Sequence, residues 1–293
     1  MRNKNSKCTK DYKQTDLFSS ENTQEQHKIS EYCEAIIVEF WCAEPFFFAS
    51  NEISASYYTE PVIGNYALAY AWDWILSPYR LYGKETNSPT YLRDINKLVS
   101  HCYIFPAYPK NFRFRFEFFN TLSDSYWFLV APNKIMVERE DLLVYLKGSG
   151  KCNSSKPSNF PQAGRIRMID RGSCFTTVIL RRPDTNIFIE KGDKKEASLN
   201  LQLPQYFRIG KFKSKIKLTV LERLKLSKLS SGIFRTDLIL NTADIPKNFN
   251  VLSFDLISMP PISLIKNVTF KGEAWQLGEM VIPANITFLG GGR

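Results

Sequence analysis

The hydrophobic positions near the start of the chain predict a strand followed by a helix. Residues 34–42 are rich in β-branched and aromatic side chains, which is typical of a strand, and residues 45–50 are expected to continue it after a break. Five apolar residues then recur at helical spacing, namely Ile63, Tyr66, Ala67, Tyr70 and Trp74. We therefore expect a helix over residues 59–77, with Thr59 as its cap and Pro61 in its first turn.

The most regular pattern lies in residues 111–118, where phenylalanines alternate with charged residues. The phenylalanines are Phe112, Phe114, Phe116 and Phe118, and the residues between them are Arg113, Arg115 and Glu117. A period of two places these two sets on opposite faces of a strand. We expect a half-buried antiparallel strand with Phe114 and Phe116 pointing inward. Arg113 and Arg115 share the other face, where they either belong to a binding surface or simply solvate the sheet.

Strand-like segments dominate the second half of the chain. They are residues 173–181, 186–190, 215–221, 232–240, 251–257, 264–271 and 278–288. One strong helix followed by many strands of the antiparallel type indicates an α+β fold. Residues 1–30 are polar and are predicted to form a flexible tail, whereas residues 31–293 are expected to form a single domain. Residues 147–160 are rich in Gly, Ser, Asn and Pro, and we interpret them as a basic loop inserted in that domain.

The chain is basic as a whole, and its charge is unevenly distributed. It has 39 Lys and Arg residues against 29 Asp and Glu residues, a formal net charge of +10, which favours a polyanionic partner. Most of the excess lies in residues 205–228, which hold eight basic residues and one acidic residue. The candidate phosphate-binding residues at its start are Arg208, Lys211, Lys213 and Lys215. Gly210, which lies among them, can adopt a positive φ and let backbone N–H groups approach a phosphate.

A second basic segment, residues 160–182, holds five Arg residues and one Asp. Its candidate binding residues are Gln162, Gly164, Arg165, Arg167 and Arg171. Aromatic residues, among them Phe160, Tyr206 and Phe207, are interleaved with the two basic segments. Cations that follow phosphates and rings that stack on bases are typical of a surface for single-stranded nucleic acid. The alternative is a solvated strand face above a core that contains the aromatic rings.

The sequence offers little material for catalysis or for metal binding. The six cysteines include no CxxC pair, no pair of carboxylates has the spacing of a two-metal nuclease, and the glycines near Lys151 lack the spacing of a phosphate-binding loop. We therefore expect neither a metal nor another cofactor. His101, with Tyr103 and a nearby Lys, is the one combination that could support metal-free RNA cleavage.

The distribution of apolar residues also bears on location. No run approaches the roughly 18 apolar residues of a membrane span, and residues 1–30 contain no apolar core of a secretory signal. We therefore expect a cytoplasmic protein that has no membrane partner.

Four segments resemble one known family. They are residues 48–52 (FASNE), 58–68 (YTEPVIGNYAL), 159–165 (NFPQAGR) and 208–215 (RIGKFKSK). Their order and spacing resemble those of the type I-D CRISPR subunit Csc-one, the Cas-five homologue, over about residues 32–220. The polar tail and the loop at residues 147–160 depart from that pattern.

The resemblance implies a RAMP protein with a ferredoxin-like (RRM-like) antiparallel sheet core and additional β-hairpins. It implies a non-catalytic subunit that caps the 5′ handle of the crRNA in a Cascade surveillance complex for antiviral defence. The implied neighbours are a Cas-seven-type backbone subunit, a Cas-ten-type large subunit, and target DNA near the protospacer-adjacent motif. A crRNA-processing endoribonuclease of the same superfamily and a basic β-rich scaffold for protein partners are the alternatives.

Overall fold

The computed structural model describes most of the chain that follows the predicted polar tail. The described residues are 31–53, 56–75, 91–120, 163–190, 196–246, 249–259 and 262–291. The predicted tail at residues 1–30 and the predicted loop at residues 147–160 lie outside this part of the chain, as do Gln162 and Phe160. Within it, the protein is mostly β-structure with few helices.

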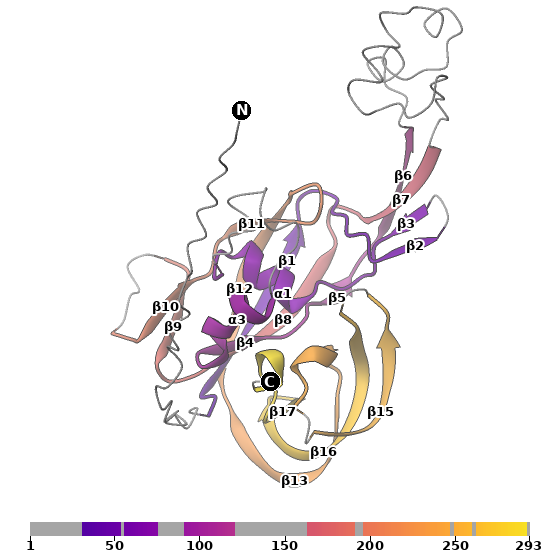
Figure 1. Cartoon of the computed structure of the whole chain (residues 1–293). Coiled ribbons are helices and arrows are strands. Elements are labelled where there is room, and N and C mark those ends of the chain that lie inside the picture. Colours follow the sequence, from indigo (N-terminus) through magenta and orange to yellow (C-terminus); the bar gives the residue numbers. More distant parts are fainter. Residues whose placement is uncertain are drawn as a thin grey trace, which may run out of the picture.

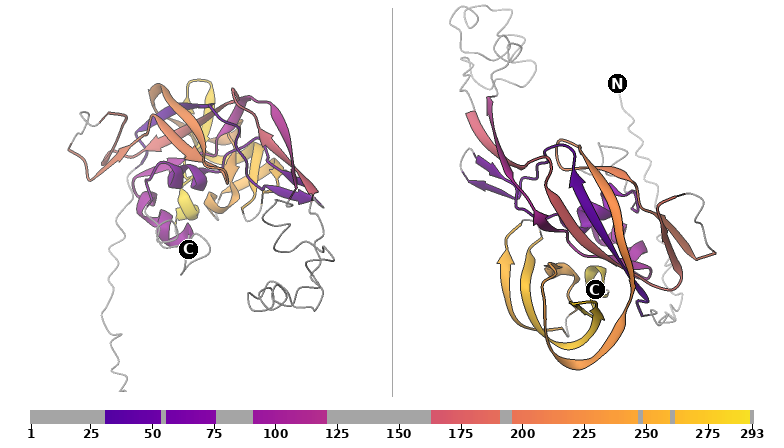
Figure 2. Two further views of the ribbon diagram at one scale, coloured as in Figure 1. Left: turned by 90° about the horizontal axis from the view of Figure 1, so that it is seen from above. Right: turned by 180° about the vertical axis from the view of Figure 1, so that it is seen from behind.

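A six-stranded sheet forms the centre of the molecule (Figure 1). Its strand order is β11 (Tyr206–Ile209), β12 (Ser214–Lys225), β1 (Glu34–Cys42), β8 (Cys174–Arg181) and β4 (Cys102–Ile104), with β5 (Tyr108–Asn111) also paired to β8. Strand β1 pairs antiparallel with both β12 and β8, so the predicted strands at residues 34–42 and 173–181 are confirmed. Helices α1 (Asn65–Ala71) and α3 (Tyr91–Val99) cover one face of this sheet, and its other face is seen from behind in Figure 2.

Alternation along β1 explains why one face of the sheet is buried. Ile36, Val38 and Phe40 are fully buried, and the Phe40 ring packs edge-on against Trp72, which follows α1. Trp41, the next residue along the strand, is 47% exposed. Because successive side chains of a strand point to opposite faces, Phe40 contributes to the core and Trp41 to the uncovered face.

The predicted helix over residues 59–77 is too long, because α1 is confined to Asn65–Ala71. Thr59 does not cap it; its hydroxyl accepts a hydrogen bond from the Phe48 backbone N–H and donates one to the Phe48 carbonyl oxygen. Ile63 exchanges backbone hydrogen bonds with Ala107. These bonds to distant segments hold residues 59–63 in an extended conformation, and apolar spacing alone did not reveal them.

A four-stranded sheet projects from the body and is called the arm here (Figure 1). Its strand order is β2 (Asn51–Ile53), β3 (Ser56–Tyr58), β7 (Ala163–Ile169) and β6 (Phe114–Asn120). Strand β6 confirms the predicted strand only from Phe114 onward, and the expected burial of its phenylalanines is wrong. Phe114 is partly buried, but Phe116 is 49% and Phe118 is 81% exposed, because the arm has no layer packed over this face in the described chain.

The C-terminal part forms a five-stranded curved sheet (Figure 1). It consists of β13 (Ser227–Thr236), β14 (Leu240–Asn241), β15 (Asn250–Ile257), β16 (Leu264–Leu277) and β17 (Met280–Pro283), with two short helices, η2 (Thr242–Asp244) and η3 (Phe288–Gly291). A separate parallel pair joins β9 (Thr185–Phe188) to β10 (Leu199–Gln202). The predicted strands of the second half are confirmed in outline, except that residues 278–288 contain only β17 and the start of η3.

A buried carboxylate connects the C-terminal part to the central body. Asp244 of η2 accepts hydrogen bonds from the Asn65 amide and the Tyr66 hydroxyl, both at 2.6 Å, and from the Tyr103 hydroxyl at 3.1 Å. The backbone N–H of Leu289 in η3 donates a fourth bond at 2.9 Å. One side chain therefore connects α1, β4, η2 and η3. Burial raises the pKa of Asp244 from 3.8 to about 6, although its hydrogen bonds act in the opposite direction.

Candidate nucleic-acid interface

Strands β11 and β12 form a hairpin that carries the predicted basic segment. Along β12, Ile216 and Leu218 are buried, whereas Lys215 and Lys217 are exposed. Cross-strand pairing places Arg208 opposite Lys215. Period-two alternation therefore puts the cations on the uncovered face of the central sheet and the apolar side chains beneath the helices.

One acidic residue, Glu44, partly neutralises the positive charge of this hairpin. The Glu44 carboxylate accepts a hydrogen bond from the Lys215 backbone N–H at 2.7 Å and lies 3.9 Å from an Arg208 guanidinium nitrogen. Arg208 also donates to the Lys213 carbonyl oxygen at 2.9 Å. The Arg208 side chain is thus oriented by the hairpin itself, while it stays exposed to solvent.

The turn of the hairpin is anchored to the segment that follows β1. Gly210 has a φ of 76°, and a Cβ at this position would lie 2.7 Å from the Phe47 carbonyl oxygen. The Lys211 N–H donates to that same oxygen at 2.9 Å. Gly210 therefore permits a close backbone contact. That Gly210 also lets N–H groups approach a phosphate stays a prediction, and the Lys211 N–H is already used within the protein.

The same segment brings the two basic regions together. Phe46 forms a bridge with Ile169 at the end of β7, while its neighbour Phe47 contacts the turn at Lys211. The Phe212 ring of this turn is exposed and stacks on Phe47 at a centroid distance of 5.5 Å. The base of the arm and the tip of the β11–β12 hairpin are therefore adjacent, although β7 ends at Ile169 and β11 begins only at Tyr206.

Two exposed aromatic rings flank a lysine on the uncovered face. Lys217 of β12 lies opposite Trp41 of β1 on one side and opposite Tyr206 of β11 on the other. Trp41 is 47% and Tyr206 is 50% exposed, and the Lys215 ammonium lies 4.5 Å from the centre of the Tyr206 ring. The row Trp41–Lys217–Tyr206 thus presents two rings and a cation side by side, as a platform for stacked bases requires.

The predicted role of Phe207 as a base-stacking residue is corrected by the structure. Phe207 is 5% exposed, and its ring packs against Phe40 and Trp72 with centroid distances of 5.4 and 6.2 Å. Its neighbour Tyr206 occupies the outer face instead. Sequence reasoning did not select Trp41, although the alternation in residues 34–42 separates it from the buried Phe40.

Arginines and aromatic rings alternate on one face of the arm. The Arg167 guanidinium lies 4.2 Å from the centre of the Phe114 ring and 4.9 Å from that of Tyr58, and Arg165 lies 5.2 Å from Phe116. Arg165 also donates to the Tyr58 hydroxyl at 3.4 Å, which lowers the pKa of Tyr58. These contacts place the guanidinium groups over aromatic rings. Arg167 also donates to the Thr59 carbonyl oxygen at 3.4 Å and lies 3.6 Å from a Glu60 carboxylate oxygen, so its charge is partly neutralised within the arm.

The remaining sequence-predicted arginines lie elsewhere on the arm. Arg115 pairs with Met168, on the face opposite to Arg165 and Arg167, and it binds Glu117 at 2.6 Å. Arg113 lies at the base, where its guanidinium approaches the Arg171 carbonyl oxygen at 3.5 Å. Gly164 pairs with Phe119 near the end of the described strand. The structure therefore brings Arg165 and Arg167 together, but it does not bring Arg115 to them.

The geometry of His101 and Tyr103 bears on the nuclease alternative. Tyr103 is fully buried and donates its hydroxyl to Asp244, so it cannot reach an RNA backbone. The His101 ring lies 3.1 Å from the Thr185 hydroxyl, and burial lowers its pKa. These two residues therefore do not form a cleavage site. Within the residues that the structure describes, no cluster of three His, Cys, Asp or Glu side chains could hold a metal ion.

Comparisons with known proteins add a family assignment. Residues 33–291 match the family model described as Type I-D CRISPR-associated protein Cas5/Csc1. A similar solved structure is a chain in the cryo-EM structure of the Type III-B Cmr-beta bound to cognate target RNA and AMPPnP, state 1. The two chains share 13% identity over 80% of this chain and 86% of the other, with a TM-score of 0.37. No curated protein matches the chain.

In the described part of the chain, no helix has the length and apolar character needed to span a membrane.

Proposed function

We propose, from the premise that the chain belongs to the type I-D CRISPR-associated Cas5/Csc1 family, that it binds and caps the 5′ handle of the crRNA. In this role it is a non-catalytic subunit of a surveillance complex for antiviral defence. The observation that carries the proposal is the row Trp41–Lys217–Tyr206 on the uncovered face of the central sheet. Rings that stack on unpaired bases beside cations that meet phosphates are what a single-stranded handle requires.

The basic side chains around this row define a path for the RNA backbone. Lys215 and Arg208 lie on the same face of the hairpin, and Lys211 stands at its tip. Beyond the tip, Arg165 and Arg167 continue the positive charge on the arm. Phosphates would meet these side chains in turn while bases stack on Trp41 and Tyr206, so that the protein reads mainly the shape and charge of the strand.

The arrangement of the central sheet supports a ferredoxin-like interpretation of the core. In the order β12-β1-β8-β4, the two strands joined by the helical segment, β1 and β4, lie on either side of β8. This is the arrangement of a split βαβ unit. Between β8 and β12 the chain forms β9, β10 and β11, where a full ferredoxin-like repeat would place a second helix.

The proposed partners follow from the proposed role. The crRNA is the direct ligand, and a Cas-seven-type backbone subunit and a Cas-ten-type large subunit are the proposed protein neighbours. Target DNA near the protospacer-adjacent motif is the proposed ligand of the assembled complex, with the crRNA supplying base pairing. The buried position of Tyr103 supports a holding role over an RNA-cleaving one.

The test is to sequence the RNA that co-purifies with the full chain after co-expression with its neighbouring subunits. We expect crRNA with a shared repeat-derived 5′ end. The double variant Lys215→Glu and Lys217→Glu should lose this RNA, while the matched variant Lys266→Glu and Lys271→Glu, with exposed lysines on β16, should retain it. Absence of RNA from a folded complex would favour the scaffold alternative. Accumulation of uncleaved repeat RNA on mutation of His101 would favour the nuclease alternative.

A further inference from the structure

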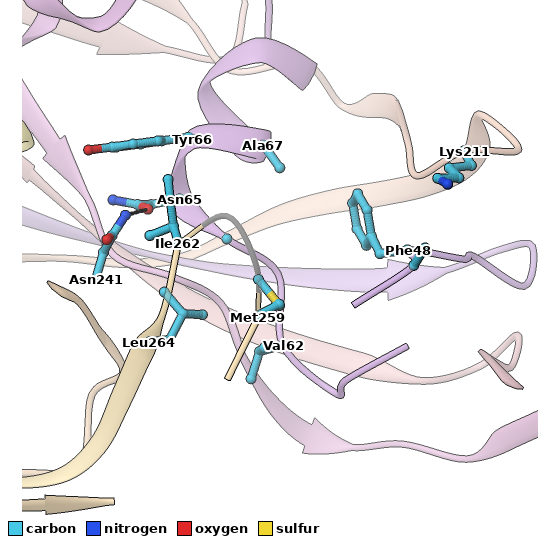
Figure 3. A pocket seen from close by; sticks show the side chains of 12 residues that line it. Phe48, Val62, Asn65, Tyr66, Ala67, Lys211, Asn241, Met259, Ile262 and Leu264 are labelled. Carbon is cyan, nitrogen blue, oxygen red and sulfur yellow. Dashed lines mark hydrogen bonds between the residues drawn. The ribbon is translucent and has the colours of Figure 1, made fainter. Parts of the chain in front are cut away.

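A pocket lies on the helix-covered side of the molecule, where α1, the segment after β1 and the C-terminal part meet (Figure 3). Its walls are mostly apolar and include Phe48, Val62, Met259 and Leu264. Asn65 and Asn241 close one end, and Lys211 lines the pocket near Phe48 at the other. The pocket therefore combines an apolar slot, a polar end and a cation.

The size of the pocket suits one aromatic ring system. Its volume is about 230 Å³. An apolar cavity of about 150 Å³ is enough to hold a benzene ring. The larger volume here accommodates a two-ring base, and it is too small for a stretch of folded polypeptide or for several nucleotides.

The polar end carries buried donors that suit a base edge. Asn65 and Asn241 are each 1% exposed. The Asn65 amide nitrogen donates to Asp244 at 2.6 Å, and the Asn241 amide nitrogen donates to the Asn65 carbonyl oxygen at 2.9 Å. Each amide nitrogen carries two hydrogens and uses one of them in these bonds. Both residues line the pocket, so we assign the second N–H of each to an acceptor on a ring edge, such as a purine N7 or O6.

The pocket shares one residue, Lys211, with the proposed RNA path. Lys211 belongs both to the pocket wall and to the tip of the β11–β12 hairpin, next to Phe47. A phosphate held by Lys211 would leave the attached base within reach of the slot. We propose that this pocket receives one purine base, turned out of the single-stranded RNA, between Phe48 and Met259. The inference rests on the proposed RNA-binding function and adds a base-selective site to it.

The test compares a pocket-filling variant with a matched variant outside the pocket. Met259→Trp fills the slot, whereas Ser258→Trp adds the same side chain at the adjacent exposed position. The probes are oligoadenylate and an abasic ribose-phosphate strand, each of about eight nucleotides, a length within the usual site size. A 2-aminopurine within the oligoadenylate reports on the environment of the base.

We expect Met259→Trp to bind oligoadenylate about tenfold more weakly than the unmodified chain and to bind the abasic strand equally well. The 2-aminopurine emission should change on binding to the unmodified chain and to Ser258→Trp, but not to Met259→Trp. Ala67→Phe, which narrows the pocket from α1, should reproduce the loss if Met259→Trp fails to fold.

Equal binding of oligoadenylate by the filled variants and by Ser258→Trp would overturn the pocket while leaving RNA binding intact. Loss of a co-purifying protein subunit with unchanged RNA binding would also overturn it, because the pocket would then hold a protein side chain. Failure of the unmodified chain to bind either strand would reject the proposed function together with the pocket.

Discussion

Trp41 lies directly opposite Lys217 across the β1–β12 pair, and both side chains are exposed on the face of the sheet opposite to the buried Phe40. Tyr206 faces the same lysine from β11. Trp41 is 47% and Tyr206 is 50% exposed, so both rings are accessible to a ligand. This arrangement supports the proposal that the face binds a ligand with flat rings and negative charge.

Removal of either ring should weaken RNA binding with little effect on folding. Trp41→Ala and Tyr206→Ala should each reduce affinity for single-stranded RNA by about tenfold, since base–aromatic stacking contributes about 1–3 kcal/mol per base. Phe254→Ala is the matched control, because Phe254 is 52% exposed but lies on β15 of the C-terminal sheet. Fluorescence anisotropy measures the affinities, and equal losses in all three variants would contradict the assignment of the stacking surface.

The basic hairpin should determine how RNA binding depends on salt. Replacing Arg208, Lys211 and Lys215 together by Ala should lower the slope of log K against log salt by about 2, because each phosphate contact on a single strand contributes about 0.7. The control changes three exposed cations of the same types in the C-terminal sheet, Arg235, Lys266 and Lys271. If the control lowers the slope as much as the hairpin variant does, the interaction is a general charge effect.

Replacement of a buried and of an exposed phenylalanine should have different effects on the free energy of unfolding. Phe207→Ala removes a ring that packs against Phe40 and Trp72, and should lower the free energy of unfolding by about 3–5 kcal/mol. Phe118→Ala, at an 81% exposed position on the arm, should change it by less than about 0.5 kcal/mol. Chemical denaturation followed by circular dichroism measures both. The reverse order of stabilities would mean that the core is wrongly placed.

The buried carboxylate of Asp244 should make stability depend on pH. Its pKa is raised from 3.8 to about 6, so between these values the folded chain binds a proton that the unfolded chain releases. The Asp244 contribution to the free energy of unfolding should therefore fall as pH rises from about 4 to about 6, by up to about 3 kcal/mol, and level off above that range. Asp244→Asn should lack this slope, whatever its absolute stability. Identical pH profiles of the two proteins would show that the pKa of Asp244 is the same in the folded and the unfolded chain.

Strands β1 and β8 and part of β12 in the central sheet could be predicted because local composition and alternation determine them. The basic segment around Gly210 lies on a β-hairpin, where alternation exposes its cations. The helix at residues 59–77 was overextended because Thr59 and Ile63 form hydrogen bonds with segments distant in the sequence. Apolar periodicity carries no information on such bonds.

Alternation also did not reveal which face of a strand is buried. In β6 it correctly separates Phe116 from Arg115, but the face with the phenylalanines is exposed and stacks against arginines of β7. In β11 the same ambiguity led us to predict Phe207 as a base-stacking residue. Phe207 is buried, however, and Tyr206 occupies the outer face. Trp41 could have been found from its opposite parity to Phe40, once the covered face of β1 was known.

The most direct test of the account is photo-crosslinking within the purified surveillance complex, using crRNA with 4-thiouridine in its 5′ handle and peptide mapping by mass spectrometry. We predict crosslinks from the handle to peptides of this chain that contain Trp41, Tyr206 or Lys217, and none from the distal end of the crRNA to these peptides. Crosslinks of the handle only to the C-terminal strands β13, β15 and β16, or only to other subunits, would contradict the claim that the uncovered face of the central sheet holds the handle.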